Sequence, residues 1–337
     1  MRLNGVVLVS AVLNFGTIRF DDGNDLPYPL YLPGYTATAW YHKKLGADLQ
    51  KDLDKSLARS ESFARGEYLQ ALAMGDSLKG EAREMVVKEL AALTGLSQSF
   101  IRKTNLRPDI NEFTKELLRE RDEKAGSQRG RTVGRLDSRY IGIDRDDAGA
   151  SFEYDPAMSA IMGPYTAAIN DYVRSELKFE SDLPYEILTG RVHPWSFGVS
   201  NEYPNVSERL RGAMSRNRNL RVFVASGVYD LATLEILAAN EAMGSGCTTA
   251  SVPPARTISA SPDWRWSYAL AMASVLDAQA ETSVRANARE GMDMLIAAAA
   301  AFGMSMGIVI GRTRRGPFSR RVSQASRSVQ RPPMPVE

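Results

Sequence analysis

Apolar residues form two short runs that lie far apart in the chain. The first lies between Leu3 and Phe15, and the second between Leu220 and Ala225. Both are rich in β-branched residues and neither alternates apolar with polar positions, so each predicts a strand buried on both faces of a parallel sheet. No comparable run stands between them in the sequence. The pattern therefore predicts a sheet that is either very small or incomplete in this chain.

Between these runs the apolar spacing changes to the three- and four-residue intervals of amphipathic helices. The change covers residues 36–118 and follows a loop predicted over 21–35, where three prolines and two glycines fall. The residues expected on buried helix faces are Ala64, Tyr68, Ala71, Leu72, Val86, Leu90, Leu93, Phe113 and Leu117. A further helix is predicted to start at Pro164, a favoured first-turn residue. The residues that it should point inward are Tyr165, Ala168, Ile169 and Tyr172. Ser207 is expected to cap the next helix.

This order of elements predicts an α/β fold in which a partial sheet is interrupted by a large helical cap. We expect a core strand and loop in residues 1–34, the helical cap in 35–200 and the return to the core, with the acid-bearing strand, in 201–240. Residues 241–311 are rich in alanine and methionine and predict a mostly helical segment. Residues 312–337 contain seven arginines with many serines and prolines, which predicts a disordered basic tail.

One acidic residue follows the second apolar run at a position of interest. Gly227 allows a sharp turn after the predicted strand, and Asp230 then stands in the loop at its carboxyl end. Open α/β sheets place ligand-binding and catalytic groups in such loops, so Asp230 is a candidate for orienting a catalytic histidine. From this segment alone, a cap of the following turn or helix is an equally open interpretation.

The sequence from residue 2 to residue 233 contains seven segments that together carry a resemblance to a known family. They are Asn4-Gly-Val-Val-Leu-Val-Ser10, Leu32-Pro-Gly-Tyr-Thr-Ala-Thr-Ala-Trp-Tyr-His-Lys-Lys-Leu45, Phe63-Ala-Arg-Gly-Glu-Tyr68, Gly134-Arg-Leu-Asp-Ser-Arg139, Gly163-Pro-Tyr165, Asn170-Asp-Tyr172 and Tyr229-Asp-Leu-Ala-Thr233. They resemble the bacterial branch of the serine carboxypeptidase family. The resemblance implies an α/β-hydrolase fold, a secreted or periplasmic protein, and hydrolysis of C-terminal peptide bonds by a Ser, Asp and His triad in that order. It places the triad acid at Asp230 and implies a peptide substrate and no cofactor.

The other two members of the triad are not found where the family has them. The family carries its serine in a Gly-x-Ser-x-Gly elbow that precedes the strand beginning at Leu3, and we expect that elbow to be absent from this chain. The base should follow the acid, whereas the two histidines, His42 and His193, both precede Asp230. We expect His42 to have a structural or surface role and His193 to be a packed loop residue.

Similarity to the family ends at residue 233. Position 234 is Leu where the family has Pro, and the residues after it show no resemblance to the family. We expect a carboxypeptidase-like chain that has lost its beginning and its end, through a displaced start and a shifted reading frame, and that is inactive as written. The alternative is a non-catalytic relative that binds peptides or another protein. The N-terminal residues predict a strand and no signal peptide.

The composition argues against some classes of partner but does not identify a partner. A net charge of +2 gives no electrostatic case for a nucleic-acid partner, and the single cysteine, Cys247, excludes an internal disulfide bond. Residues 294–311 form a stretch of 18 residues without a charge, followed by arginines. This stretch reaches the lower limit for a membrane span, although its alanines and glycines favour a buried helix. Membrane anchoring through 294–311 therefore stays an alternative, and the oligomeric state is open.

Two further groups of charged residues are weaker candidates for binding sites. Asp144, Asp146 and Asp147 precede Gly149 as in a calcium loop, but the later ligand positions lack the required oxygen donors, which favours a solvated loop. The four arginines at 129, 131, 135 and 139 have the charge to bind an anion. We expect them to form structural ion pairs instead.

Overall fold

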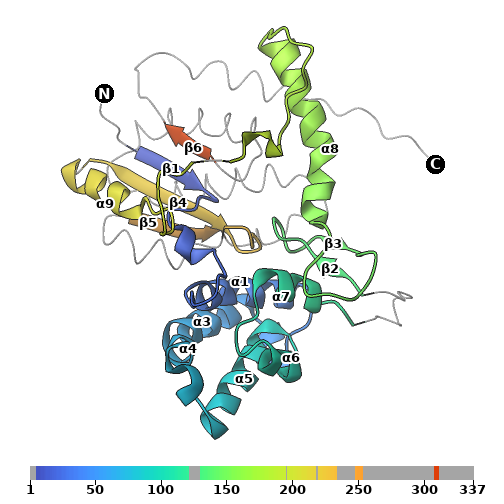
Figure 1. The fold of residues 1–337 in the computed structure, drawn as a ribbon, viewed down its shortest axis with the longest axis vertical. Coiled ribbons are helices and arrows are strands. Elements are labelled where there is room, and N and C mark those ends of the chain that lie inside the picture. The colour runs from blue at the N-terminus through green and yellow to red at the C-terminus, as the bar shows by residue number, and fades with distance from the viewer. Residues whose placement is uncertain are drawn as a thin grey trace.

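The computed structural model describes residues 5–120, 130–194, 196–217, 219–233, 247–252 and 307–310. Figure 1 shows a sheet in the upper half and a unit of short helices below it. A long helix, α8 (Pro156–Asp171), stands beside the sheet. The chain begins in the sheet, enters the helical unit, and returns to the sheet through α9 (Ser207–Arg216).

The two apolar runs form neighbouring parallel strands. β1 (Gly5–Val9) pairs with β4 (Arg221–Gly227) from Gly5 opposite Arg221 to Val9 opposite Ala225. The prediction of a strand in each run is confirmed. Two further strands complete a four-stranded sheet in the order β5-β4-β1-β6, with β5 (Cys247–Val252) parallel to β4 and β6 (Gly307–Ile310) antiparallel to β1.

The strands β5 and β6 fall in the segment 241–311, for which a mostly helical structure is predicted. That prediction is wrong for these residues, because the alanine content of the whole segment outweighed two local groups of β-branched residues. The final residues of the uncharged stretch 294–311 belong to β6, so they are not part of a helix. The remainder of this segment and the predicted tail at 312–337 lie outside the described residues. Among the described helices, none has the length and hydropathy needed to cross a bilayer.

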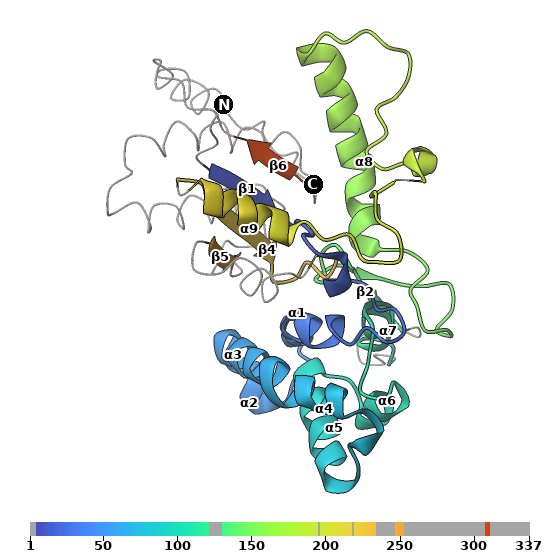
Figure 2. The same ribbon diagram turned by 60° about the vertical axis from the view of Figure 1, so that its left-hand side comes forward.

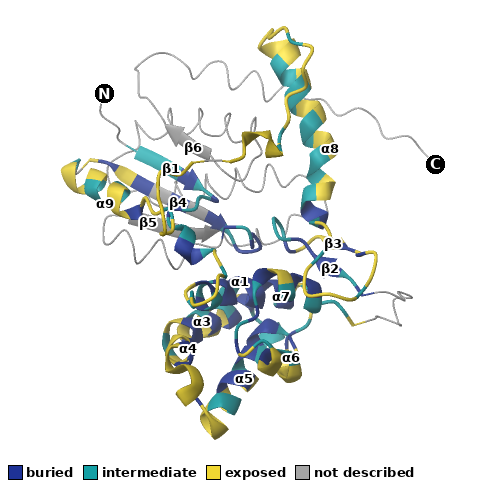
Figure 3. Ribbon diagram, in the orientation of Figure 1, coloured by how far each residue is buried: buried dark blue, intermediate teal, exposed yellow. Residues whose placement is uncertain are grey.

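The helical unit is built around α1 (Pro27–Tyr41), which is buried along most of its length. The other elements of the unit are α2 (Ala47–Gln50), α3 (Leu53–Phe63), the π-helix η2 (Ala64–Tyr68), α4 (Leu69–Met74), η3 (Gly75–Ser77), α5 (Gly80–Thr94), α6 (Gln98–Lys103) and α7 (Ile110–Glu116). Every residue predicted to lie on a buried helix face between 64 and 117 is buried in one core cluster. Figure 3 shows this core as the dark interior of the unit.

The predicted loop over 21–35 is wrong in its second half, where α1 begins. Pro27 and Pro29 occupy the first turn of this helix, where backbone amides have no intrahelical acceptor and a proline costs no hydrogen bond. Pro33 lies inside the helix. The predicted boundary between core and cap at residue 34 therefore falls in the middle of α1.

After the helical unit, a short hairpin leads to α8. The hairpin consists of β2 (Thr132–Val133) and β3 (Ile141–Gly142). α8 starts at Pro156, capped by the Asp155 carboxylate, and contains Pro164 in its interior, so the predicted start at Pro164 is wrong. Of the four residues predicted to point inward, Ala168 is exposed, whereas Tyr165, Ile169 and Tyr172 are half-buried. Figure 3 shows exposed and half-buried residues along most of the helix. The π-helix η5 (Tyr172–Glu176) and the 3-10 helix η6 (Gly190–Val192) follow.

Helix α9 covers one face of the sheet, as Figure 2 shows. Leu210 and Met214 pack against a cluster that includes Leu8 and Val222 from the two central strands. Ser207 is the first residue of the helix and not its cap, because its amide donates to the Asn205 side-chain oxygen over 3.0 Å.

Candidate functional site

Asp230 lies in the turn that follows β4. Its amide donates to the Gly227 carbonyl oxygen over 3.0 Å, which closes the turn. A Cβ atom on Gly227 would lie 3.3 Å from the Asp230 Cβ, so a residue without a side chain suits this close approach. The neighbours Tyr229 and Leu231 are buried against the helical unit. Asp230 is thereby fixed between the carboxyl end of β4 and the helices.

Three donors hold the Asp230 carboxylate. The Ser10 hydroxyl donates to Oδ2 over 2.6 Å, and the Thr233 hydroxyl donates to the same oxygen over 2.8 Å. The Ala232 amide donates to Oδ1 over 2.9 Å. Asp230 therefore organises its own turn, as the capping interpretation predicts, and also joins that turn to β1 through Ser10.

Burial governs the electrostatics of this carboxyl group. Desolvation raises the pKa of Asp230 above its ordinary value of 3.8, and the hydrogen bonds from Ser10, Thr233 and Ala232 lower it without cancelling that effect. Nearby cations are not among the causes of the shift. The carboxylate is thus stabilised by hydrogen bonds from neutral groups, in an interior position.

Ser10 is the least expected member of this site. It follows the last residue of β1 and has a φ of 47°, in the left-handed region that residues with a side chain rarely adopt. Both features direct a short polar side chain from the end of β1 to the turn after the neighbouring strand. Ser10 has its hydroxyl committed to Asp230 and is almost fully buried.

Neither histidine forms a hydrogen bond with Asp230. His42 Nε2 lies 2.7 Å from the Ser138 carbonyl oxygen, so this nitrogen carries a proton and donates it. Burial lowers the pKa of His42 from its ordinary value of 6.5, and its role is structural, as expected. His193 is exposed, which contradicts the prediction of a packed loop residue. The structure does not bring a histidine base to the acid.

The expectation that the chain contains no Gly-x-Ser-x-Gly sequence is wrong. Residues 303–307 read Gly-Met-Ser-Met-Gly, with Ser305 at the centre. Residues 303–306 lie outside the described part of the chain, and Gly307 begins strand β6. A nucleophile elbow leads from a strand into a helix, whereas this sequence leads into a strand. It therefore lacks the structural context of an elbow.

A loop from the helical side crosses the turn that carries Asp230. The Leu231 amide donates to the Arg135 carbonyl oxygen over 2.9 Å, and the Ser138 amide donates to the Tyr229 carbonyl oxygen over 2.9 Å. Ser138 is also fixed to α1, since its hydroxyl lies 2.6 Å from that of Thr38. The residues on both sides of Asp230 are thus bound to the loop 135–138.

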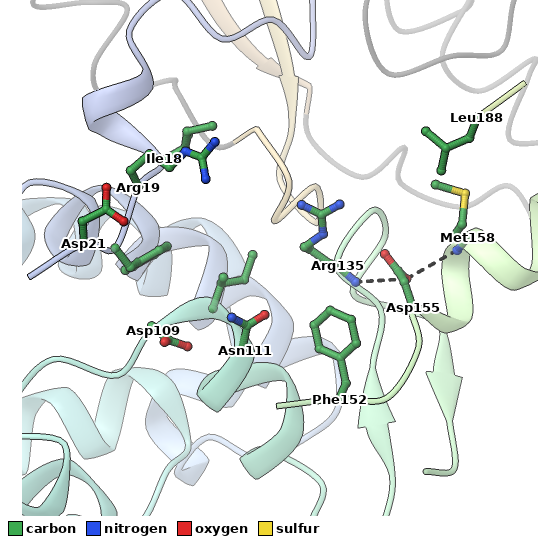
Figure 4. Close-up of a pocket in the computed structure, with 12 residues that line it drawn as sticks. Ile18, Arg19, Asp21, Asp109, Asn111, Arg135, Phe152, Asp155, Met158 and Leu188 are labelled. Carbon is green, nitrogen blue, oxygen red and sulfur yellow. Dashed lines mark hydrogen bonds between the residues drawn. The ribbon is translucent and has the colours of Figure 1, made fainter. Parts of the chain in front are cut away.

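The same loop forms one wall of a cavity of about 570 Å³. Figure 4 shows that its other walls come from the segment 18–21, the start of α7, and the start of α8. Cavities of roughly 300–1,000 Å³ are the size in which proteins hold small ligands. The cavity therefore offers a binding space whose wall is continuous, through Arg135, with the turn of Asp230.

The four arginines predicted to form ion pairs do not behave alike. Arg139 pairs with Asp137 over 2.7 Å and lies over the Tyr229 ring, as expected for a structural role. Arg135 lines the cavity and its guanidinium forms no ion pair with a described residue, contrary to the prediction. Arg129 lies outside the described residues.

The suspected calcium loop has a structural explanation. The Asp144 carboxylate is buried and pairs with Lys115 over 2.5 Å, so the prediction of a solvated loop is wrong at this residue. Lys115 also donates to the Asp146 carbonyl oxygen, and Asp147 accepts from the Gly130 amide. Across the part of the chain that the structure describes, no group of acidic, histidine or cysteine side chains is arranged to hold a metal ion.

Comparisons of this chain with protein-family models, with curated proteins and with solved structures found no match.

Proposed function

We propose that this chain is a serine carboxypeptidase-like protein that binds peptides without cleaving them. One observation carries the proposal: Asp230 is a buried, hydrogen-bonded carboxylate at the carboxyl end of a central parallel strand, in the position that the resemblance assigns to the triad acid. This proposal is the non-catalytic alternative that the sequence leaves open, and it locates the peptide-binding site beside Asp230.

The absence of cleavage follows from the partners of Asp230. General-base activation of a serine requires an imidazole within hydrogen-bond reach of the nucleophile, with an acid that orients it. The oxygens of Asp230 accept from two hydroxyls and an amide, and the two histidines of the chain lie elsewhere. Asp230 retains a structural task in this arrangement, because it connects the ends of β1 and β4.

Peptide binding is supported by the cavity beside this turn. Its walls come from both the helical unit and the segment leading to α8, and it has room for a short peptide. The cavity lies against the loop 135–138, which is hydrogen-bonded to both neighbours of Asp230. A peptide bound there would lie at the edge where open α/β sheets bind their ligands.

The test combines binding and hydrolysis on the purified full chain. A dye-labelled, N-blocked dipeptide with a free carboxyl group is titrated while fluorescence anisotropy is recorded, and release of the C-terminal amino acid is followed by mass spectrometry. We expect saturable binding, no release above buffer, and unchanged binding in Asp230→Asn. Release that Asp230→Asn abolishes would show a working hydrolase, and a flat anisotropy titration would remove the peptide-binding function.

A further inference from the structure

Two arginines that line the cavity form no ion pair within the part of the chain that the structure describes. The side chains of Arg19 and Arg135 both line it, one from the segment after η1 (Phe15–Thr17) and one from the loop before β3. Figure 4 shows their guanidinium groups directed into the space between the walls. Neither group forms a hydrogen bond or ion pair with a described residue. Other arginines of the helical unit do so, such as Arg107, which binds Asp25 through two nitrogens at 2.6 and 2.7 Å.

The acidic residues of the cavity are committed to other groups. Asp109 caps α7 by accepting from the Glu112 amide over 2.8 Å. Asp155 accepts from the Arg135, Leu136 and Ala157 amides through its two oxygens. The Asp21 carboxylate accepts from the Tyr203 hydroxyl over 3.0 Å. The three carboxylates hold the walls in place and keep their negative charge, so they lie in the lining beside the two guanidinium groups, which form no ion pair with a described residue.

The rest of the lining is largely apolar. Phe20 and Ile110 come from the helical side, and Phe152, Met158 and Leu188 come from the side of α8. A ligand suited to this surface has an apolar group beside its negative charge. A guanidinium presents paired N–H donors that match the two oxygens of a carboxylate.

We propose that this cavity selects acidic peptides, with a Glu or Asp side chain of the peptide bound by Arg19 and Arg135 and a neighbouring apolar residue packed on Phe20 and Phe152. This inference rests on the proposed function and deepens it, since it names which peptides are bound. It adds a recognition element that is separate from Asp230 and independent of any catalytic step.

The test uses three labelled peptides of equal length that differ at one position, Glu, Gln or Lys, each followed by Leu. Each is titrated against the full chain and against Arg19→Gln, Arg135→Gln and Arg65→Gln. Arg65 is the matched control, because it is exposed on η2 and is not part of the cavity lining. The affinity for the Gln peptide also reports whether each variant retains its fold.

We expect the chain to bind the Glu peptide about tenfold or more tightly than the Gln peptide, the Lys peptide to bind most weakly, and either cavity variant to remove this preference. Arg65→Gln should change no affinity more than about twofold. Equal affinity for the Glu and Gln peptides, or a preference for the Lys peptide, would overturn acidic selection while leaving peptide binding intact. A Glu preference that survives both cavity variants would overturn the assignment to this cavity. Failure of all three peptides to bind would refute the proposed function itself.

Discussion

The hydrogen bond between Ser10 and Asp230 provides a test of how the acid is held. Ser10→Ala removes one of the two hydroxyl donors to Oδ2 and keeps the backbone constraint at φ 47° nearly unchanged. A hydrogen bond to an ionised group contributes roughly 1.5–3 kcal/mol, whereas one between neutral groups contributes about 0.5–1.5 kcal/mol. We therefore expect Ser10→Ala to lower the free energy of unfolding by about 2 kcal/mol when Asp230 is ionised.

The pH dependence of this loss follows from the raised pKa of Asp230. Because the folded state holds the Asp230 proton more tightly than the unfolded state, this group's contribution to stability falls as pH rises from 3.8 through the raised pKa. Ser10 opposes that effect, since its hydrogen bond lowers the pKa of Asp230. The loss in Ser10→Ala should therefore be full at pH values above the raised pKa, where Asp230 is ionised, and smaller, by about 1 kcal/mol, below it, where Asp230 is protonated.

Urea unfolding curves followed by tryptophan fluorescence measure both quantities, and Trp40, which packs beside the cluster containing Tyr229, reports on this region. Ser62→Ala is the matched control, because Ser62 is exposed on α3 and should change stability by less than about 0.5 kcal/mol. A Ser10→Ala protein as stable as the parent chain, or a loss that is the same at every pH, would refute this account of the site.

Two further predictions concern buried charge elsewhere. Lys115→Met leaves the Asp144 carboxylate buried without its ion-pair partner, so we expect the free energy of unfolding to fall by about 3–5 kcal/mol. Adding Asp144→Asn should restore most of this loss. A thermal melt of Lys115→Met that matches that of the parent chain would contradict the prediction. Burial lowers the pKa of His42, so the stability it contributes is lost as pH falls below 6.5. His42→Gln, which can still donate to Ser138, should therefore reduce the drop in melting temperature between pH 7 and pH 5.5. An equal drop in both proteins would count against a half-buried, neutral imidazole at His42.

The sequence was sufficient to predict an element where the spacing of its apolar residues matches the face that is buried. The spacing of Val86, Leu90 and Leu93 predicts a buried helix face, and all three side chains are buried in α5. The β-branched content around Val6 and Val222 predicts strands, and the structure has them as neighbours. In both cases a local pattern reports directly on which side chains leave water.

The errors have physical causes that a local pattern does not contain. Three prolines between 27 and 33 suggested a loop, yet two of them occupy the first turn of α1, where proline is tolerated. The strand β6 contains β-branched residues and pairs with β1, but the sequence before it is rich in alanine, which suggested a helix. A short strand in such a context is determined by its partners in the sheet.

The candidate site was also predictable from local sequence only in part, because some of its contacts depend on the fold. The position of Asp230 follows from the strand and turn pattern that precedes it, whereas its contact with Ser10 joins residues 220 positions apart. Arg135 was expected in an ion pair because it falls within the stretch that resembles the carboxypeptidase family. The structure directs the carboxylate of Asp155 to backbone amides instead, and this arrangement depends on the fold of both loops.

We propose that this chain binds peptides beside Asp230 and does not cleave them. The most direct measurement is the titration of the full chain with the labelled, N-blocked dipeptide, in which bound peptide and released C-terminal amino acid are determined in the same sample. We expect saturable binding with all of the peptide recovered intact, both for the parent chain and for Asp230→Asn. Release of the amino acid by the parent chain but not by Asp230→Asn, or no binding at any concentration, would contradict it.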